Sequence, residues 1–149
     1  MKTHLLVAVL LLLGACVSIE VEKEGLSAEN VILASTGSEG EMNEATQDSF
    51  VPGDEVSIVF LNVHGLELGE DGLYKYDVDI ELKGASGETL YVETDLIGEA
   101  GHRALEGGIA KSPAGTIETI KSMPKGTYTL TVTLKDKVSG KSLTESRDF

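Results

Sequence analysis

The stretch LYKYDVDIELKG, residues 73–84, decides the fold of this chain. Its apolar residues are Tyr74, Tyr76, Val78, Ile80 and Leu82, and they alternate strictly with Lys75, Asp77, Asp79, Glu81 and Lys83. A period of two is that of a β-strand with one buried face. Strands of a parallel sheet are covered on both faces and are apolar throughout, so this alternation indicates an antiparallel sheet.

The same period recurs in GTYTLTVTLKDK, residues 126–137, where the polar positions are mostly Thr. The run DEVSIVFLNVHG, residues 54–65, is more uniformly apolar and predicts a central strand that ends near His64. Weaker strand candidates are ENVILAS (29–35), ETLYVET (88–94), TIETI (116–120) and KSLTESRDF (141–149). Turn-forming residues separate these segments at 52–54, 69–72, 84–88, 124–126 and 137–140.

About seven short strands separated by turns predict an all-β fold, an antiparallel β-sandwich of immunoglobulin type over residues 27–149. PKGTYTLTVTLKDKVSGKSLTESRDF (124–149) resembles the last hairpin of immunoglobulin-like and fibronectin type III-like domains of prokaryotic surface proteins, and FVPGDEVSIVFLNVHGL (50–66) resembles their earlier strand. The chain has no Trp and no pair of cysteines, so the resemblance implies only the wider architecture. Tyr128, two residues after Gly126, is a candidate for the tyrosine-corner hydrogen bond of these folds.

The N-terminus has the three-part layout of a secretory signal peptide. MKTH supplies a positive charge, residues 5–13 are an unbroken apolar run, and LGAC ends it with small residues. The run is shorter than the roughly 20 residues that a membrane-spanning helix needs. Cys16 is the only cysteine, so it forms no disulfide within the chain and lacks partners for a structural zinc site.

Leu13, Gly14, Ala15 and Cys16 resemble the lipobox of bacterial and some archaeal lipoproteins. The resemblance implies diacylglycerol on the Cys16 sulfur, cleavage before Cys16, and often a further acyl chain, such as palmitate, on the new N-terminus. Val17 in place of Asp favours the outer membrane, facing the periplasm or the cell surface, if the organism is Gram-negative. An ordinary signal peptide beside a cysteine, or a buried Cys16, stays an alternative.

These observations divide the chain into a signal peptide (1–15), a lipidated N-terminus with a short tether (16–26) and one sandwich domain (27–149).

The whole chain has a formal net charge of −13, and residues 16–149 keep 11 Lys and Arg against 25 Asp and Glu. Such a surface repels phosphate backbones and anionic head groups, which argues against nucleic-acid binding and electrostatic membrane association. The predicted membrane contact is therefore the lipid on Cys16.

Two long segments are candidate binding loops, Ser35 to Ser49 and Leu96 to Gly115, the second containing His102 and Arg103. Loops of this length are often functional, although a plain flexible crossover is the favoured interpretation of both.

A calcium site is a further hypothesis, because Asp77, Asp79 and Glu81 share one strand face and Glu67, Glu70 and Asp71 precede it. Alternate residues of a strand lie about 6.6–7 Å apart and do not converge by themselves. The preceding turn also lacks the ligand order of an EF-hand. A solvated polar face is the favoured interpretation, and no metal or cofactor is predicted.

No catalytic motif is present, and His64 and His102 are the only histidines after residue 15. Stacking on sugars needs exposed aromatic rings, for which Tyr91 is the main candidate. We therefore predict a non-catalytic protein-binding or scaffolding lipoprotein of the cell envelope. A small-ligand or cation (calcium) binder is the alternative, followed by a hydrolase with an unfamiliar site. A partner module should have an exposed apolar patch or an unpaired sheet edge.

Overall fold

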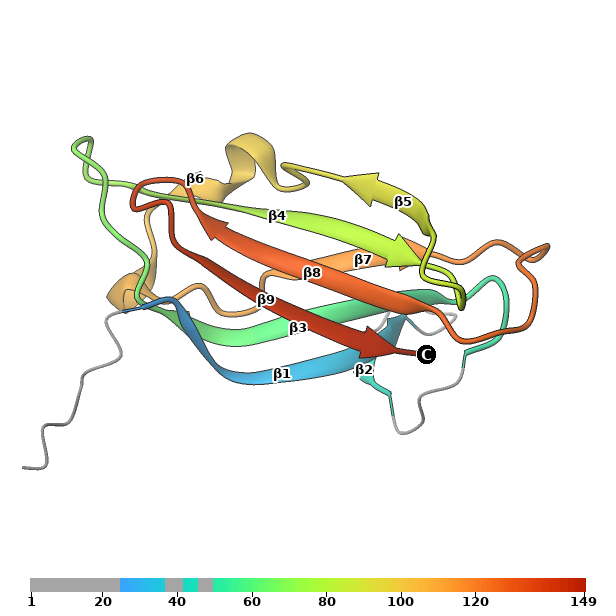
Figure 1. Cartoon of the computed structure of the whole chain (residues 1–149). Coiled ribbons are helices and arrows are strands. Elements are labelled where there is room, and N and C mark those ends of the chain that lie inside the picture. Colours follow the sequence, from blue (N-terminus) through green and yellow to red (C-terminus); the bar gives the residue numbers. More distant parts are fainter. Residues whose placement is uncertain (1–24, 37–41, 46–49) are drawn as a thin grey trace, which may run out of the picture.

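The computed structural model describes residues 25–36, 42–45 and 50–149, and the described part is all-β (Figure 1). The strands are β1 (Ser27–Thr36), β2 (Met42–Glu44), β3 (Glu55–His64), β4 (Tyr74–Lys83), β5 (Thr89–Glu93), β6 (His102–Arg103), β7 (Ala114–Glu118), β8 (Thr129–Asp136) and β9 (Ser142–Asp148). Two short 3-10 turns, η1 (Gly98–Gly101) and η2 (Glu106–Gly108), join them. The predicted signal peptide, Cys16 and the tether as far as residue 24 lie outside the described residues.

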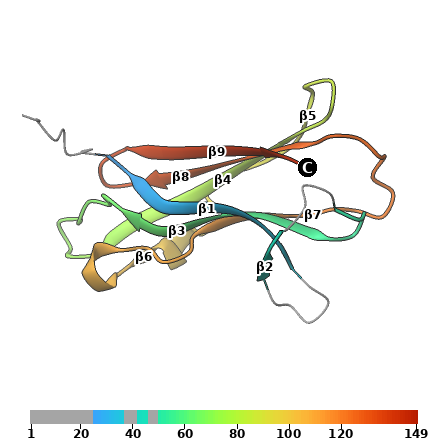
Figure 2. The ribbon, with the colours of Figure 1, turned by 90° about the horizontal axis from the view of Figure 1, so that it is seen from below.

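The strands form two antiparallel sheets that stack face to face (Figure 2). One sheet has the order β2-β1-β3-β7, and the other has the order β5-β4-β8-β9 with β6 paired to the beginning of β4. All strand pairs are antiparallel. The predicted antiparallel β-sandwich is therefore confirmed, and β3 is the central strand that its apolar run predicts.

The core lies between the sheets and is built from the positions that the alternation predicts. Tyr76, Val78, Ile80 and Leu82 of β4 pack with Leu130, Val132 and Leu134 of β8, against Val56, Ile58 and Phe60 of β3. In β3 the residues between these, Ser57 and Val59, are buried as well. This double burial explains why β3 is apolar throughout while β4 and β8 alternate.

Two local features of the first sheet adjust its packing. Asn62 has a φ of 50° within β3, and both Phe60 and Val63 are buried in the core on either side of this irregularity. Asn tolerates such a left-handed conformation better than most residues.

Gly115 of β7 is buried, and a Cβ there would lie 2.5 Å from the Ile80 side chain and 2.7 Å from the Val132 side chain. Only glycine lets β7 approach the opposite sheet so closely.

The described parts of the two predicted loops contain short elements that the sequence did not predict. The first, from Ser35 to Ser49, contains the end of β1 and the short strand β2, while residues 37–41 and 46–49 lie outside the described part. The second, Leu96 to Gly115, contains η1, β6, η2 and the start of β7, so a plain flexible crossover is the wrong description. Backbone hydrogen bonds from Phe60 N to Pro113 O (2.9 Å) and from Asn62 N to Lys111 O (2.9 Å) hold its second half along β3.

The two ends of the sandwich carry different chain segments. β1 begins at one end, and the C-terminal residue Phe149 lies at the other, beside the β4–β5 turn and the β7–β8 loop (Figure 1). Within the described residues, no helix has the length and apolar character needed to cross a bilayer.

Candidate functional site

Exposed large apolar side chains gather at the end of the sandwich that is remote from the start of β1. The described residues include seven such side chains, of which Leu68 and Val138 lie elsewhere and Val92, opposite Glu81 of β4, lines neither hollow. The other four are Val51, Leu90, Tyr91 and Ile120, and we call this group with the two hollows beside it the apolar end. Val51 and Ile120 are the most exposed, at 69% and 63%. Isolated surface apolar residues are ordinary, whereas a large contiguous apolar patch is typical of interaction surfaces.

The larger hollow of the apolar end lies between β5 and β7, the last strands of the two sheets on the same side of the sandwich. It has a volume of about 550 Å³. Its walls include Leu82 and Ile117 from the core and Leu90 and Tyr91 from β5, and Ile120 lies at its rim. The floor is therefore formed by the sandwich core and the walls by exposed apolar residues.

The smaller hollow, of about 390 Å³, lies on the other side of the β7–β8 loop and shares Met123, Pro124 and Tyr128 with the first. Phe149 contacts Phe50 edge to face with ring centroids 5.6 Å apart, and it stacks on Tyr128 at 5.9 Å. These three rings give the second hollow a rigid aromatic wall.

The loop between the hollows is fixed by the hydrogen bond that the sequence predicts for Tyr128. Its hydroxyl donates to the Pro124 carbonyl oxygen at 2.6 Å, four residues upstream. The Tyr128 and Phe149 backbones also exchange two hydrogen bonds of 2.9 Å. The hydrogen bond that the sequence predicts for Tyr128, from its hydroxyl to a backbone carbonyl a few residues upstream, is therefore present.

β5 forms an edge of its sheet, because it pairs with β4 and has no strand on its other side among the described residues. Every residue of β5 is exposed, and the register against β4 shifts between Leu82 and Lys83. Tyr91 is exposed, as predicted, and its hydroxyl donates a hydrogen bond to the Glu93 carboxylate, which raises the pKa of Tyr91. An edge strand exposes unpaired backbone N–H and C=O groups, and here apolar side chains surround them.

The opposite edge of the same sheet, β9, is built differently. Its half-buried side includes Glu145 and Arg147, which form an ion pair with each other. On its exposed side, hydroxyl groups bond across to β8, with Thr131 to Ser146 at 2.8 Å and Thr133 to Thr144 at 3.0 Å. Inward-pointing charges are a device that prevents an edge from pairing with another strand.

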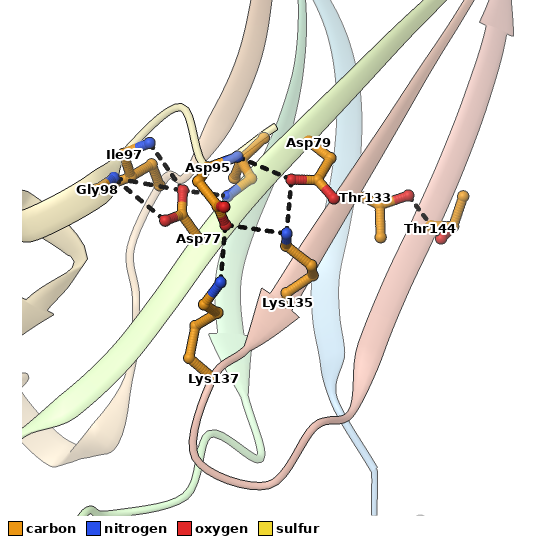
Figure 3. A network of polar contacts seen from close by, with 10 residues as sticks. Asp77, Asp79, Asp95, Ile97, Gly98, Thr133, Lys135, Lys137 and Thr144 are labelled. Carbon is orange, nitrogen blue, oxygen red and sulfur yellow. Dashed lines mark hydrogen bonds and ion pairs between the residues drawn. The ribbon is translucent and has the colours of Figure 1, made fainter. Parts of the chain in front are cut away.

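The acidic face of β4 is structural and only partly solvated, which corrects the expectation of a solvated polar face. Asp77 is buried, and its Oδ1 accepts hydrogen bonds from the backbone N–H groups of Val78 (2.9 Å) and Ile97 (2.8 Å). The Gly98 N–H lies 3.2 Å from its Oδ2 (Figure 3). This carboxylate therefore fixes the start of η1 on β4.

Two residues further along β4, Asp79 joins a network of charges shown in Figure 3. Its Oδ1 accepts from the Asp95 N–H at 2.9 Å and lies 2.7 Å from Lys135 Nζ. Asp95 Oδ1 in turn lies 3.1 Å from Lys135 Nζ and 2.7 Å from Lys137 Nζ. Both lysines lower the pKa of Asp95, Lys137 more strongly, and Asp79 raises the pKa of Lys135. Lys135 and Lys137 therefore form ion pairs with the Asp79 and Asp95 carboxylates, which a bound cation would need as ligands.

The remaining candidate ligands and catalytic groups are dispersed. Within the described ranges, no three His, Cys, Asp or Glu side chains come together as a metal site. His64 contacts Glu29 at 3.1 Å, and His102 contacts Asp71 at 2.6 Å. The Leu73 N–H and His102 lower the pKa of Asp71. Arg103 lines a third hollow of about 640 Å³ with Glu106 and Lys111, a polar site in the second long loop.

The sequence predicted the exposure of Tyr91 but not the apolar end as a group. Leu90 and Val92 belong to a predicted strand, whose free edge no local pattern reveals. Val51 and Ile120 are distant in sequence, and only the fold brings their segments together. A scan against protein-family models finds no match to this sequence, and a search of curated proteins finds none either.

Proposed function

We propose that this protein is a lipid-anchored lipoprotein that binds a protein partner at the cell envelope, without catalysis. The observation that carries the proposal is the apolar end, with four exposed large apolar side chains around two hollows beside a sheet edge. The lipobox resemblance at Cys16 supplies the anchor. The predicted occupant of the apolar end is an extended apolar segment of another envelope protein, because an open strand edge suits strand addition.

The position of the apolar end fits an anchored binding module. The described chain begins at the start of β1, at the opposite end of the sandwich (Figure 1). A ten-residue strand such as β1 is about 33 Å long, at about 3.3 Å per residue. The described chain therefore enters the domain at the end opposite to the apolar end.

Cross-linking in intact cells, followed by mass spectrometry of the membrane-purified protein, tests this proposal. We expect the wild type to capture a stoichiometric envelope protein, and the unanchored Cys16→Ser version to lose it. Ile120→Lys, in the apolar end, should abolish capture, whereas Val138→Lys, an exposed apolar position outside it, should retain it. No repeatable partner, or full capture by Ile120→Lys, would refute the proposal.

A small apolar ligand is a second candidate, because the volume of the larger hollow lies within the range of small-molecule pockets. A binding ligand stabilises the folded state by mass action, so candidate compounds should raise the melting temperature. Ile117→Trp, which fills the hollow from a core position, should remove such a shift. The same assay with calcium tests the cation alternative, for which we expect no shift.

A further inference from the structure

We propose that an extended segment of the envelope partner adds to β7 as a new edge strand, covers the side of β5 that faces the larger hollow, and alternates apolar with basic residues. The inference rests on the proposed function, that the apolar end binds a protein. It adds which strand accepts the segment and what chemistry the segment has. In this contact β7 supplies the backbone hydrogen bonds, and β5 supplies apolar side chains.

The two sheets do not end at the same place on this side of the sandwich. β7, the last strand of the first sheet, packs on β4 and β8, because a Cβ on Gly115 would lie within 2.7 Å of the side chains of Ile80 and Val132. β5 is the next strand beyond β4, and no described strand lies beyond β7 in the first sheet. One side of β5 is therefore uncovered, and a strand added beside β7 would lie over it.

A bulge gives that side of β5 its apolar character. Leu82 of β4 pairs with Tyr91 and Lys83 pairs with Thr89, so Leu90 is an extra residue in β5. Both Leu90 and Tyr91 line the larger hollow, and they are 50% and 45% exposed. A strand over β5 would bury both side chains. The same bulge makes the free backbone edge of β5 irregular, so β5 is less suited than β7 to accept a strand.

β7 has a free edge without a register shift, and this edge opens into the larger hollow. The hydrogen bond from Phe60 N to Pro113 O shows that residue 113 points its carbonyl group at β3. Because this direction alternates along an antiparallel strand, the N–H and C=O of Thr116 point away from β3. Thr116 and Glu118 are exposed and line the larger hollow. A segment paired with Thr116 would direct every second side chain into the hollow.

The charges of β7 favour basic residues at the other positions of the segment. Glu118 lies directly opposite Glu55 of β3, on the outer face of the first sheet. Neither carboxylate forms an ion pair within the described part of the chain. Like charges directly opposite each other destabilise a strand pair, and a Lys or Arg beside Glu118 on the added strand would relieve this repulsion. The formal net charge of −13 attracts the same kind of segment.

Photo-cross-linking of the anchored full-length protein in intact cells tests where the segment lies. A photoreactive amino acid replaces Thr116 on β7, and Thr144, an exposed threonine on the edge strand β9, is the matched control position. We expect an adduct from position 116 with the protein that the wild type captures, and none from position 144. Mass spectrometry of the digested adduct should locate the attachment in a segment where apolar and basic residues alternate.

Glu118→Lys tests the charge of the segment without weakening the fold, because it places a cation opposite Glu55. Capture should fall about tenfold, since a basic segment would then meet a like charge. The melting temperature should stay the same or rise. Glu70→Lys makes the same change in net charge at an exposed residue outside the apolar end, and it should retain capture.

The outcomes separate this inference from the proposed function. A partner that the wild type captures but that forms no adduct at position 116, or an adduct in a segment without the alternation, overturns strand addition at β7 and leaves the proposed function in place. Full capture by Glu118→Lys, or an adduct with a second copy of this chain, overturns it as well. If the wild type captures no protein, the proposed function fails, and this inference fails with it.

Discussion

The two edge strands of the β5-β4-β8-β9 sheet, β5 and β9, differ in the chemical character of their side chains. β9 has a charge pair on its half-buried side and a ladder of hydroxyl hydrogen bonds on its exposed side. β5 has Leu90, Tyr91 and Val92, all exposed, beside an apolar hollow. Natural sheets usually protect both edges. The proposed protein contact uses the edge with exposed apolar side chains, and β9, with its ion pair, is the internal comparison.

The largest loss of stability is expected when the segment that follows β5 loses its hydrogen bonds to Asp77. Asp77→Ala leaves the N–H groups of Ile97 and Gly98 without their acceptor. We expect a loss of about 2–3 kcal/mol in the free energy of unfolding, since bonds to a charged group are worth about 1.5–3 kcal/mol and the freed donors are partly buried. Urea denaturation measures this change. Asp148→Ala, at the exposed end of β9, should change stability by about 0.5 kcal/mol or less; equal losses would contradict this account of Asp77.

A smaller effect is expected at the loop that separates the two hollows. Tyr128→Phe removes the hydrogen bond to the Pro124 carbonyl oxygen but keeps the ring against Phe149. The expected loss is about 1 kcal/mol, as for a typical hydrogen bond. Thermal unfolding with Tyr91→Phe as control checks it, because the Tyr91 hydroxyl bonds only an exposed carboxylate. A greater loss in Tyr91→Phe would show that the corner does not stabilise this end.

Exchanging the character of the two edges should change association more than stability. Val92→Lys gives β5 the charge of a protected edge, and it should weaken capture of the envelope partner with a change in stability within about 0.5 kcal/mol. The double variant Glu145→Leu with Arg147→Leu removes the protection of β9 and should create new association or aggregation. Cross-linking in intact cells measures the first change, and light scattering after size-exclusion chromatography measures the second. Unchanged capture by Val92→Lys would mean that β5 is not the contact.

The smallest effect concerns the charges beside the end of β5. Lys137 and Lys135 lower the pKa of Asp95 in the folded state. Asp95 therefore contributes stability that is fully present above its ordinary pKa and is lost as the pH falls through the lower folded pKa. Asp95→Asn should lessen the acid dependence of the melting temperature in that interval. Identical acid profiles for wild type and variant would contradict a role for this network.

Much of the fold could be predicted from local patterns. The alternation in residues 73–84 and 126–137 predicted β4 and β8 with the correct faces inward, because burial of one face imposes a period of two. The uniformly apolar run of β3 predicted a central strand. The two- and three-residue strands β6 and β2 were not predicted, because so few residues have no measurable period.

The candidate site was less predictable, because it depends on contacts between distant segments. The sequence of β4 does not reveal that Asp77 is buried, since its partners Ile97 and Gly98 come from the next connection. The apolar end likewise joins residues 50–52, 90–91, 120–128 and 149, which meet only when both sheets are stacked. Leu90 and Val92 are typical strand residues, and only the strand order shows that their edge is free.

The most direct test of the difference between the edges is site-specific photo-cross-linking of the anchored protein in intact cells. A photoreactive amino acid replaces Val92 on β5 in one strain and Thr144 on β9 in another. Both side chains are exposed, so the probe itself should be tolerated equally. The account predicts discrete protein adducts from position 92 and none from position 144. Adducts of equal yield from both positions, or from position 144 alone, would contradict it.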